Sequence, residues 1–301
     1  MTPSSAAVTA PRPSRAACHQ HVIRLLQNGC VPHEVLRSPL LQFEDHYFRS
    51  GSQRRRRPWR IMFQNKRLII LDADGTTIDA YPAIEQAFAL NGMALGAEKS
   101  FQKRHHLFKY LGGVKEFPSI IKKNMRQRGR KKIVASLTDV YRCEAKLYPG
   151  IADLINSLIA APDVIVGLVT RNITNEPLET LRLLFARHDI DVDQFDFFDH
   201  VPLRQGKTAQ FRLTRERFEV NPARAYICGD EYKDFHAAIS TGMHPFMVSY
   251  GFEDHDRLTE KFCVPNEVIS RTSAELCARI CHALDLPAAP GQLNIPGGVG
   301  K

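Results

Sequence analysis

Between residues 67 and 251, short apolar runs alternate with longer segments of helical periodicity. The first run, at 67–71, is rich in branched residues and leads into a polar turn, and further runs lie at 163–172, 195–201, 224–231 and 244–251. Short apolar runs that end in turns are typical of buried parallel strands, because helices cover both faces of such a sheet. The alternation therefore predicts an α/β fold with a doubly wound, Rossmann-like parallel sheet.

Helices are predicted between these runs, at 151–161, 176–188, 209–218 and 234–242. The alternation is interrupted once, at residues 79–148, where helical patterns alone follow one another at 81–92, 99–113, 116–129 and 131–148. Gly92, Gly112, Gly113 and Gly129 are expected to separate these helices. We therefore predict an all-helical cap domain that is inserted after the first strand and lies over the carboxyl ends of the strands.

The chain is expected to have four parts. The first 17 residues are rich in Ser, Ala and Pro and contain no acid, which is typical of poorly ordered segments. We predict a basic, partly disordered extension at 1–66, an α/β core at 67–78 and 149–287, the helical cap at 79–148 and a flexible tail at 288–301.

Positive charge is concentrated in two of these parts. The net charge of +9 includes 11 basic and 3 acidic residues in 1–66, and 14 basic and 6 acidic residues in 79–148, so the core is net acidic. Arg54 to Arg57 could contact nucleic acid or an anionic membrane, or could be a solvated linker. The cap charge favours either a closing surface complementary to the core or attraction of an anionic substrate, while the basic segment 122–132 also suits a solvated helix and loop. The cap residues considered for substrate contact are His105, His106, Lys109, Lys115 and Arg126.

The expected localisation is cytoplasmic, with no membrane association. No stretch approaches the roughly 20 apolar residues that a membrane-spanning helix needs, and the amino-terminal segment lacks the apolar run of a secretory signal. The acid-poor start would also suit an organelle transit peptide. The oligomeric state is left open.

Two aspartates at the end of the first predicted strand carry the chemistry. Asp72 and Asp74 are two residues apart, with Gly75 and Thr76 following. At such a strand end, both carboxylates can approach one ligand. One can attack phosphorus and form an acyl phosphate, while the other, with a raised pKa, protonates the leaving oxygen and later activates water. Repulsion between the two carboxylates calls for a cation.

The ends of other runs provide complementary groups. Thr170 and its neighbour Arg171 are candidates for binding phosphoryl oxygens, and Lys207 supplies a point positive charge, with Lys233 as a rival. Asp230 and Asp234 are hard oxygen ligands that suit Mg²⁺, and the metal ligands are expected among Asp72, Asp74, Asp230 and Asp234. Glu231 either tunes the metal or is exposed.

These residues resemble the four motifs of the haloacid dehalogenase-like hydrolase superfamily. The first motif matches Asp72, Asp74, Gly75 and Thr76, the second Thr170, the third Lys207, and the fourth Gly229, Asp230 and Asp234. The resemblance covers about residues 67–284. An insertion between the first two motifs is similar to the helical cap of the phosphoglycolate phosphatase-like branch.

The resemblance implies a Mg²⁺-dependent phosphatase that acts on a small phosphorylated metabolite through an aspartyl phosphate. In such an enzyme, Asp72, the backbone carbonyl of Asp74 and Asp230 would hold the Mg²⁺. An acid at Asp74 favours phosphate over halide, because a halide needs no proton. A phosphotransferase or sugar-phosphate mutase would use the same site, and a binding or regulatory protein that retains the fold is a third hypothesis.

Overall fold

The computed structural model describes residues 63–93 and 127–287. The predicted tail and most of the predicted extension, including Arg54 to Arg57, lie outside these ranges. The cap candidates His105, His106, Lys109, Lys115 and Arg126 also lie outside them. Within the described ranges, no helix combines the length and apolar character needed to cross a bilayer.

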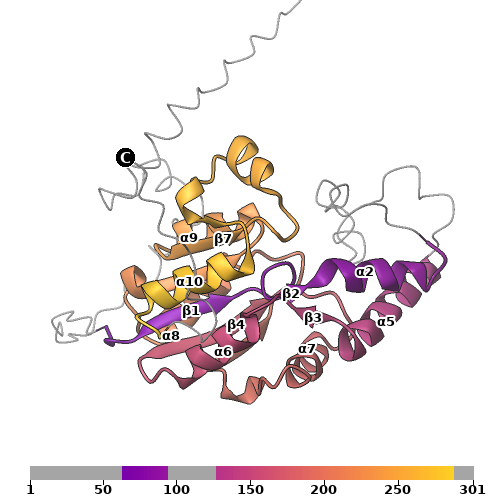
Figure 1. Ribbon diagram of the computed structural model, residues 1–301, viewed down its shortest axis with the longest axis horizontal. Helices are drawn as coiled ribbons and strands as arrows, with labels where there is room; N and C mark the ends of the chain where they lie inside the picture. The colour runs from indigo at the N-terminus through magenta and orange to yellow at the C-terminus, as the bar shows by residue number, and fades with distance from the viewer. Residues whose placement is uncertain (1–62, 94–126, 288–301) are drawn as a thin grey trace, which may run out of the picture. The chain divides into compact units, whose positions relative to one another are not determined.

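A parallel sheet of six strands forms the core (Figure 1). The strands are β1 (Arg67–Leu71), β4 (Val164–Thr170), β5 (Phe197–His200), β6 (Ala225–Gly229), β7 (His244–Val248) and β8 (Ile269–Ser270). Five of the six coincide with predicted runs, and the sheet confirms the predicted fold class. The two-residue strand β8 was not predicted, because two residues show no periodicity.

The strand order is β5-β4-β1-β6-β7-β8, and every neighbouring pair is parallel. The chain therefore moves outward from β1 to β5, returns to the other side of β1, and continues outward to β8. Ligands in such sheets bind beyond the carboxyl ends of the strands, at the point where the order reverses. In this chain that point lies at the ends of β1 and β6.

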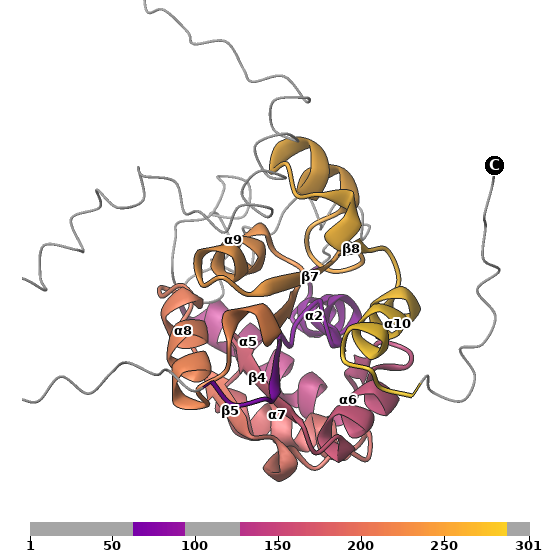
Figure 2. The same cartoon turned by 90° about the vertical axis from the view of Figure 1, so that its left-hand side faces the viewer.

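Helices cover both faces of the sheet (Figure 2). They are α6 (Ile151–Ala160), α7 (Pro177–Ala186), α8 (Thr208–Arg217), α9 (Tyr232–Ser240) and α10 (Ser273–Ala283). Single helical turns are found at Val192–Gln194, Pro222–Arg224, Arg257–Lys261 and Asn266–Val268.

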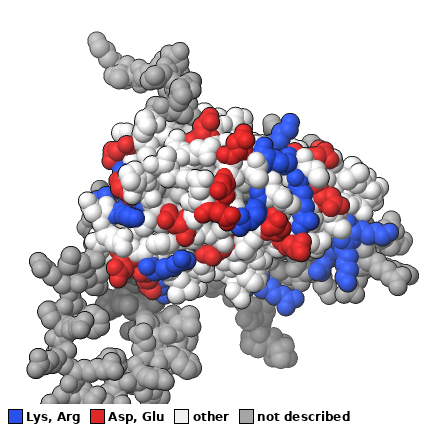
Figure 3. Space-filling model, turned by 90° about the horizontal axis from the view of Figure 1, so that it is seen from below, with Lys and Arg blue, Asp and Glu red and all other residues white. Residues whose placement is uncertain are grey.

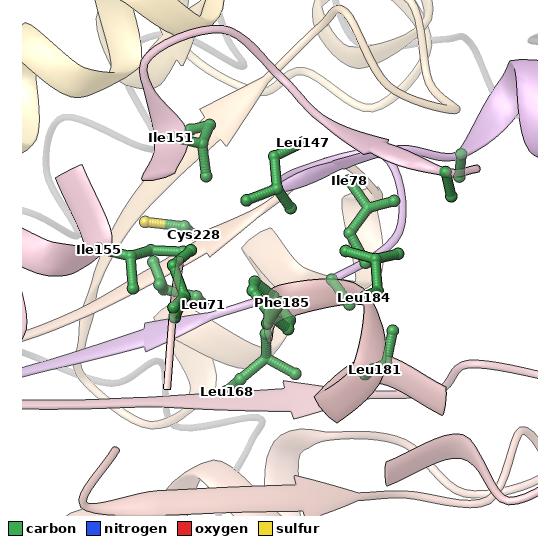
Figure 4. Packing of buried hydrophobic residues seen from close by; sticks show 14 of the residues in the cluster. Leu71, Ile78, Leu147, Ile151, Ile155, Leu168, Leu181, Leu184, Phe185 and Cys228 are labelled. Carbon is green, nitrogen blue, oxygen red and sulfur yellow. The ribbon is translucent and has the colours of Figure 1, made fainter. Parts of the chain in front are cut away.

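Alternate residues of β1 face opposite cores. Ile69 and Leu71 pack in the cluster beneath α6, α7 and α10, where Figure 4 shows Leu71. Leu68 and Ile70 pack beneath α8 and α9. All four side chains are at most 1% exposed. Burial of each stabilises the fold by roughly 1.5–3 kcal/mol. The strand is thus anchored on both faces, which holds the loop after it in one position.

The inserted segment begins and ends in a small antiparallel ribbon. Strands β2 (Ile78–Asp79) and β3 (Lys146–Leu147) pair with each other, and Ile78 and Leu147 point into the α6-side core (Figure 4). The prediction of helices alone in 79–148 is therefore wrong at β3, because a two-residue strand leaves no pattern. Helices α2 (Ala80–Ala89) and α5 (Gln127–Cys143) pack side by side and extend from this ribbon toward the right of the view in Figure 1.

The predicted helix break at Gly129 is also wrong. Helix α5 is helical from Gln127 and continues through this glycine to Cys143. A single glycine costs a helix only about 1 kcal/mol relative to alanine, which packing readily offsets. The apolar residues of α5, including Ile133 and Leu137, are buried with those of α2.

Candidate active site

Asp72 follows β1 directly and is buried at the sheet edge. Its Oδ1 accepts a hydrogen bond from the amide of Ala73 at 2.8 Å, and its Oδ2 lies 2.6 Å from Nζ of Lys207. Lys207 precedes α8, and its ammonium group also lies 3.0 Å from Oδ1 of Asp234. The lysine that contacts Asp72 is thus Lys207, and it links the end of β1 to the start of α9.

Two further carboxylates come from the end of β6 and the first turn of α9. Asp230 is 1% exposed, and its Oδ2 accepts a hydrogen bond from the amide of Phe252 at 2.6 Å. Asp234 accepts one from the amide of Glu231 at 3.3 Å and so also caps α9. One carboxylate oxygen from each of Asp72, Asp230 and Asp234 lies within 4.8 Å of the others.

This cluster fits a divalent cation. When all three buried carboxyls are ionised, they face one buried ammonium group, and two negative charges remain for a cation to neutralise. The Oδ1 atom of Asp230 is buried and has no hydrogen-bond partner among the described residues, which is costly unless a ligand occupies that position. Carboxylate oxygens are the ligands that Mg²⁺ prefers. Asp74 was predicted to bind the metal through its backbone carbonyl, and this contact stays a prediction; its side chain is not part of the carboxylate cluster.

Burial controls the protonation of the cluster. Loss of hydration raises the pKa of Asp72 to about 7, although Lys207 opposes the shift. Burial, with the charge of Asp72, raises the pKa of Asp230 well above its usual range. Burial by itself would lower the pKa of Lys207, but Asp234 and Asp72 outweigh this effect and raise it. Lys207 is therefore charged, whereas the carboxyls of Asp72 and Asp230 compete for protons until a cation compensates them.

Mg²⁺ is expected to stabilise the protein more at about pH 8 than at about pH 5. Carboxyls of an unfolded chain titrate near pH 4, whereas burial in the folded protein raises the pKa values of Asp72 and Asp230. Any stability that these groups contribute is therefore lost as the pH rises toward 7. Bound Mg²⁺ reverses that loss. At a concentration 100 times Kd it adds about 2.7 kcal/mol, or roughly 5–10 °C in Tm.

Thermal unfolding with Mg²⁺ and with EDTA at the two pH values measures this effect. Asp230→Asn, which removes one proposed ligand, should abolish most of the Mg²⁺ response. An equal Mg²⁺ effect at both pH values would contradict the expected site.

Asp74 is held by two side chains from different parts of the chain. Tyr141 on α5 donates a hydrogen bond from its hydroxyl to Oδ1 of Asp74 at 2.7 Å. The amide nitrogen of Asn172 lies 3.1 Å from each carboxylate oxygen. Burial raises the pKa of Asp74, while these hydrogen bonds from Tyr141 and Asn172 lower it. The result is an oriented carboxyl group with a raised pKa, which suits proton transfer near neutral pH.

Thr170 and Arg171 differ in their position relative to the site. Arg171 forms an ion pair with Glu231 and lines one cavity with Asp72 and Asp74. Other residues lining this cavity are Leu203, Lys207, Asp230, Glu231 and Phe252. Thr170 is fully buried at the end of β4, and its hydroxyl accepts a hydrogen bond from the amide of Asn172 at 3.0 Å. Its predicted contact with a phosphoryl group stays a prediction.

Sequence reasoning missed Tyr141 and Asn172. Asn172 stands two residues after Thr170 at a strand end, so its position was a usable signal, whereas Tyr141 is one of many residues in a helical pattern. Gly75 also has a defined role here. Its φ is +79°, and a Cβ atom at this position would lie 2.3 Å from Oδ2 of Asp230. Glycine therefore lets the loop after β1 approach the metal cluster.

The sequence model of one protein family, described as haloacid dehalogenase-like hydrolase, matches residues 66–242. This span is more than half of the chain, and it contains every predicted site residue. The chain belongs to the haloacid dehalogenase-like hydrolases. The predicted family and its hydrolase class are thereby confirmed.

Relatives of this hydrolase are similar over most of their length. A phosphoglycolate phosphatase from Nitrosospira multiformis is 25% identical over 210 residues, which cover 65% of this chain and 88% of that protein. A haloacid dehalogenase-like family hydrolase from Streptococcus pneumoniae has a TM-score of 0.52 at 20% identity, covering 72% of this chain and 99% of that one.

CbbY from Rhodobacter sphaeroides, solved in complex with xylulose-(1,5)bisphosphate, has a TM-score of 0.50 at 17% identity, covering 69% of this chain and 94% of that one. At these identities, the two solved structures show that the hydrolase shares their fold.

Proposed function

We propose that this hydrolase is a Mg²⁺-dependent phosphatase that cleaves a small phosphomonoester through an aspartyl phosphate on Asp72. The observation that carries the proposal is the pairing of two carboxyls with different surroundings at one strand end. Asp72 contacts a lysine ammonium group at 2.6 Å, whereas Asp74 is held by the neutral donors Tyr141 and Asn172. The phosphatase among the relatives supports the same reaction class.

In the first step, a carboxylate oxygen of Asp72 forms a bond to phosphorus. The bond from phosphorus to the leaving oxygen breaks, and Asp74 transfers its proton to that oxygen. In the second step, Asp74 takes a proton from water, the water oxygen attacks phosphorus, and the bond to Asp72 breaks. Phosphate and the alcohol are released, and both carboxyls return to their initial states.

The remaining groups stabilise charge. Lys207 and Arg171 neutralise oxygens of the transferring phosphoryl group, and Thr170 is proposed to contribute a hydrogen bond at the end of β4. Asp72, Asp230 and Asp234 would hold Mg²⁺, which supplies positive charge beside the phosphoryl group. Burial of the site in the protein strengthens these electrostatic contributions. In our proposal the domains follow the predicted boundaries, with the core carrying the chemistry and 79–148 acting as a cap.

Release of inorganic phosphate from a panel of phosphomonoesters tests the proposal. We expect turnover that requires Mg²⁺ and stops with EDTA. Phosphorus NMR distinguishes hydrolysis from transfer, because a phosphotransferase or mutase would produce a new phosphate ester instead of free phosphate. Absence of turnover over a broad panel, with Mg²⁺ binding intact, would favour a binding role and contradict the proposed activity.

A further inference from the structure

A second, larger cavity adjoins the catalytic carboxyls. Its volume is about 520 Å³, and it lies between α5 and the loop that follows β4. Its lining includes Arg130, Lys131, Asn172, Asn175, Pro177 and Leu203. Small-molecule sites have volumes of roughly 300–1,000 Å³, so this cavity is large enough for part of a metabolite.

The cavity and the catalytic site share residues. Leu203 lines both, and Asn172 lines the larger cavity while its amide donates to both carboxylate oxygens of Asp74. In the proposed function, Asp74 gives its proton to the leaving oxygen. The cavity therefore opens on the side of the site where the leaving alcohol must lie.

Among the residues that the structure describes, the lining of this cavity carries positive charge and no negative charge. Arg130 and Lys131 provide two cations, and the described lining contains no acid. Neither residue forms an ion pair with any other described residue. Glu176, beside the lining residue Asn175, is already paired with Arg142 at 2.8 Å. Figure 3 shows several basic side chains gathered at the side of the molecule where α5 lies in Figure 1.

Helix α7 adds a further favourable contribution. Asn175 and Pro177 place the amino-terminal end of this ten-residue helix at the cavity. The partial positive charge of a helix amino terminus attracts anions. Glu179 in the first turn of α7 offsets part of this charge, but it is itself paired with Arg182 at 3.6 Å. The cations of α5 and the amino-terminal end of α7 thus line the same cavity, and both favour binding of a negatively charged group there.

We propose that this cavity binds a second anionic group, carried by the leaving alcohol of the substrate. The substrate class is then a phosphomonoester whose leaving group also bears a carboxylate or another phosphate. This inference rests on the proposed function for the side of the site on which the alcohol lies. Arg130 and Lys131 are the specificity-determining residues, while Asp72 and Asp74 perform the chemistry.

Calorimetry on full-length Asp72→Asn protein with Mg²⁺ tests the binding without turnover. Two pairs of ligands show which second anion the cavity binds. The first pair, 3-phosphoglycerate and glycerol 3-phosphate, differs by a carboxylate. The second pair, fructose 1,6-bisphosphate and fructose 6-phosphate, differs by a phosphate. In at least one pair, we expect the ligand with the extra anion to bind about tenfold tighter or more. The pair with the larger ratio identifies the anion. Equal binding within both pairs would overturn the proposal.

Charge-removing substitutions in the same background locate the effect. Arg130→Gln and Lys131→Gln should each reduce a tenfold preference by roughly threefold, since two equal contributions of that size make up about tenfold, with little change for the ligand that lacks the second anion. Lys132→Gln is the matched control, because Lys132 is an exposed neighbour on α5 that does not line the cavity. The assignment is wrong if both ligands of a pair weaken equally, or if Lys132→Gln has the same effect.

Turnover by the otherwise unchanged enzyme separates this inference from the proposed function. A binding preference that depends on Arg130 and Lys131, without any release of phosphate, would support the cavity assignment and contradict the phosphatase. Phosphate release with no discrimination within either pair would support the phosphatase and overturn the assignment.

Discussion

Replacing Asp72 by Asn is expected to lower kcat on the order of 10⁴-fold or more, as loss of a covalent nucleophile does in other enzymes. The amide has almost the same shape as the carboxylate, but its oxygen is a poor nucleophile and cannot form a stable acyl phosphate. The carboxylate oxygen that is removed lies 2.6 Å from Lys207, so the change is confined to the centre of the site.

The Asp72→Asn protein should remain folded. Lys207 keeps its contact with Asp234 at 3.0 Å, and the new amide has no charge for burial to penalise. Burial raises the pKa of Asp72 to about 7, so above that pH the metal-free variant avoids the cost of a buried carboxylate. We therefore expect its metal-free Tm at about pH 8 to equal or exceed that of the unchanged protein.

Phosphate release and thermal unfolding, measured on the same preparation, distinguish lost chemistry from lost folding. Asp153→Asn, at an exposed position in the first turn of α6, is a matched control that makes the same chemical change. Turnover by Asp72→Asn within tenfold of the unchanged enzyme would exclude Asp72 as the nucleophile.

Asp74→Asn is expected to slow the hydrolysis of alkyl phosphates by about 10²–10⁴-fold, because the leaving alkoxide then receives no proton from this residue. With p-nitrophenyl phosphate the first step should be nearly normal, since p-nitrophenolate leaves without protonation. The second step still requires a base to activate water. We therefore expect a burst of one p-nitrophenolate per active site, followed by slow turnover.

Stopped-flow absorbance measures this burst. The position of Asp74 explains why the substitution should affect proton transfer and not metal binding. The carboxyl is held by Tyr141 at 2.7 Å and by Asn172 at 3.1 Å, outside the carboxylate cluster of Asp72, Asp230 and Asp234. Its loss should leave Mg²⁺ binding largely unchanged. Equal slowing of the first step for alkyl and p-nitrophenyl phosphates would show that Asp74 is not the proton donor.

The sequence by itself determined five of the six strands of the sheet, and the points where β1 and β6 end. Runs such as 67–71 and 224–231 are apolar because both faces of a central parallel strand are buried, and this requirement is visible residue by residue. The same local pattern placed Asp72 and Asp74 after β1, and Asp230 after β6. Since carboxyl ends of parallel strands meet at one edge, their proximity could be predicted.

Only the tertiary structure decided which side chains surround these carboxyls. Tyr141 reaches Asp74 from a helix 67 residues away, and Asn172 from a loop 98 residues away. The β2–β3 ribbon, the close approach at Gly75 and the cavity beside Arg130 likewise join segments that are distant in the sequence. Such contacts depend on how elements pack against one another. Hydrophobic periodicity reports only which face of each element is buried, and so it cannot specify the partner across the interface.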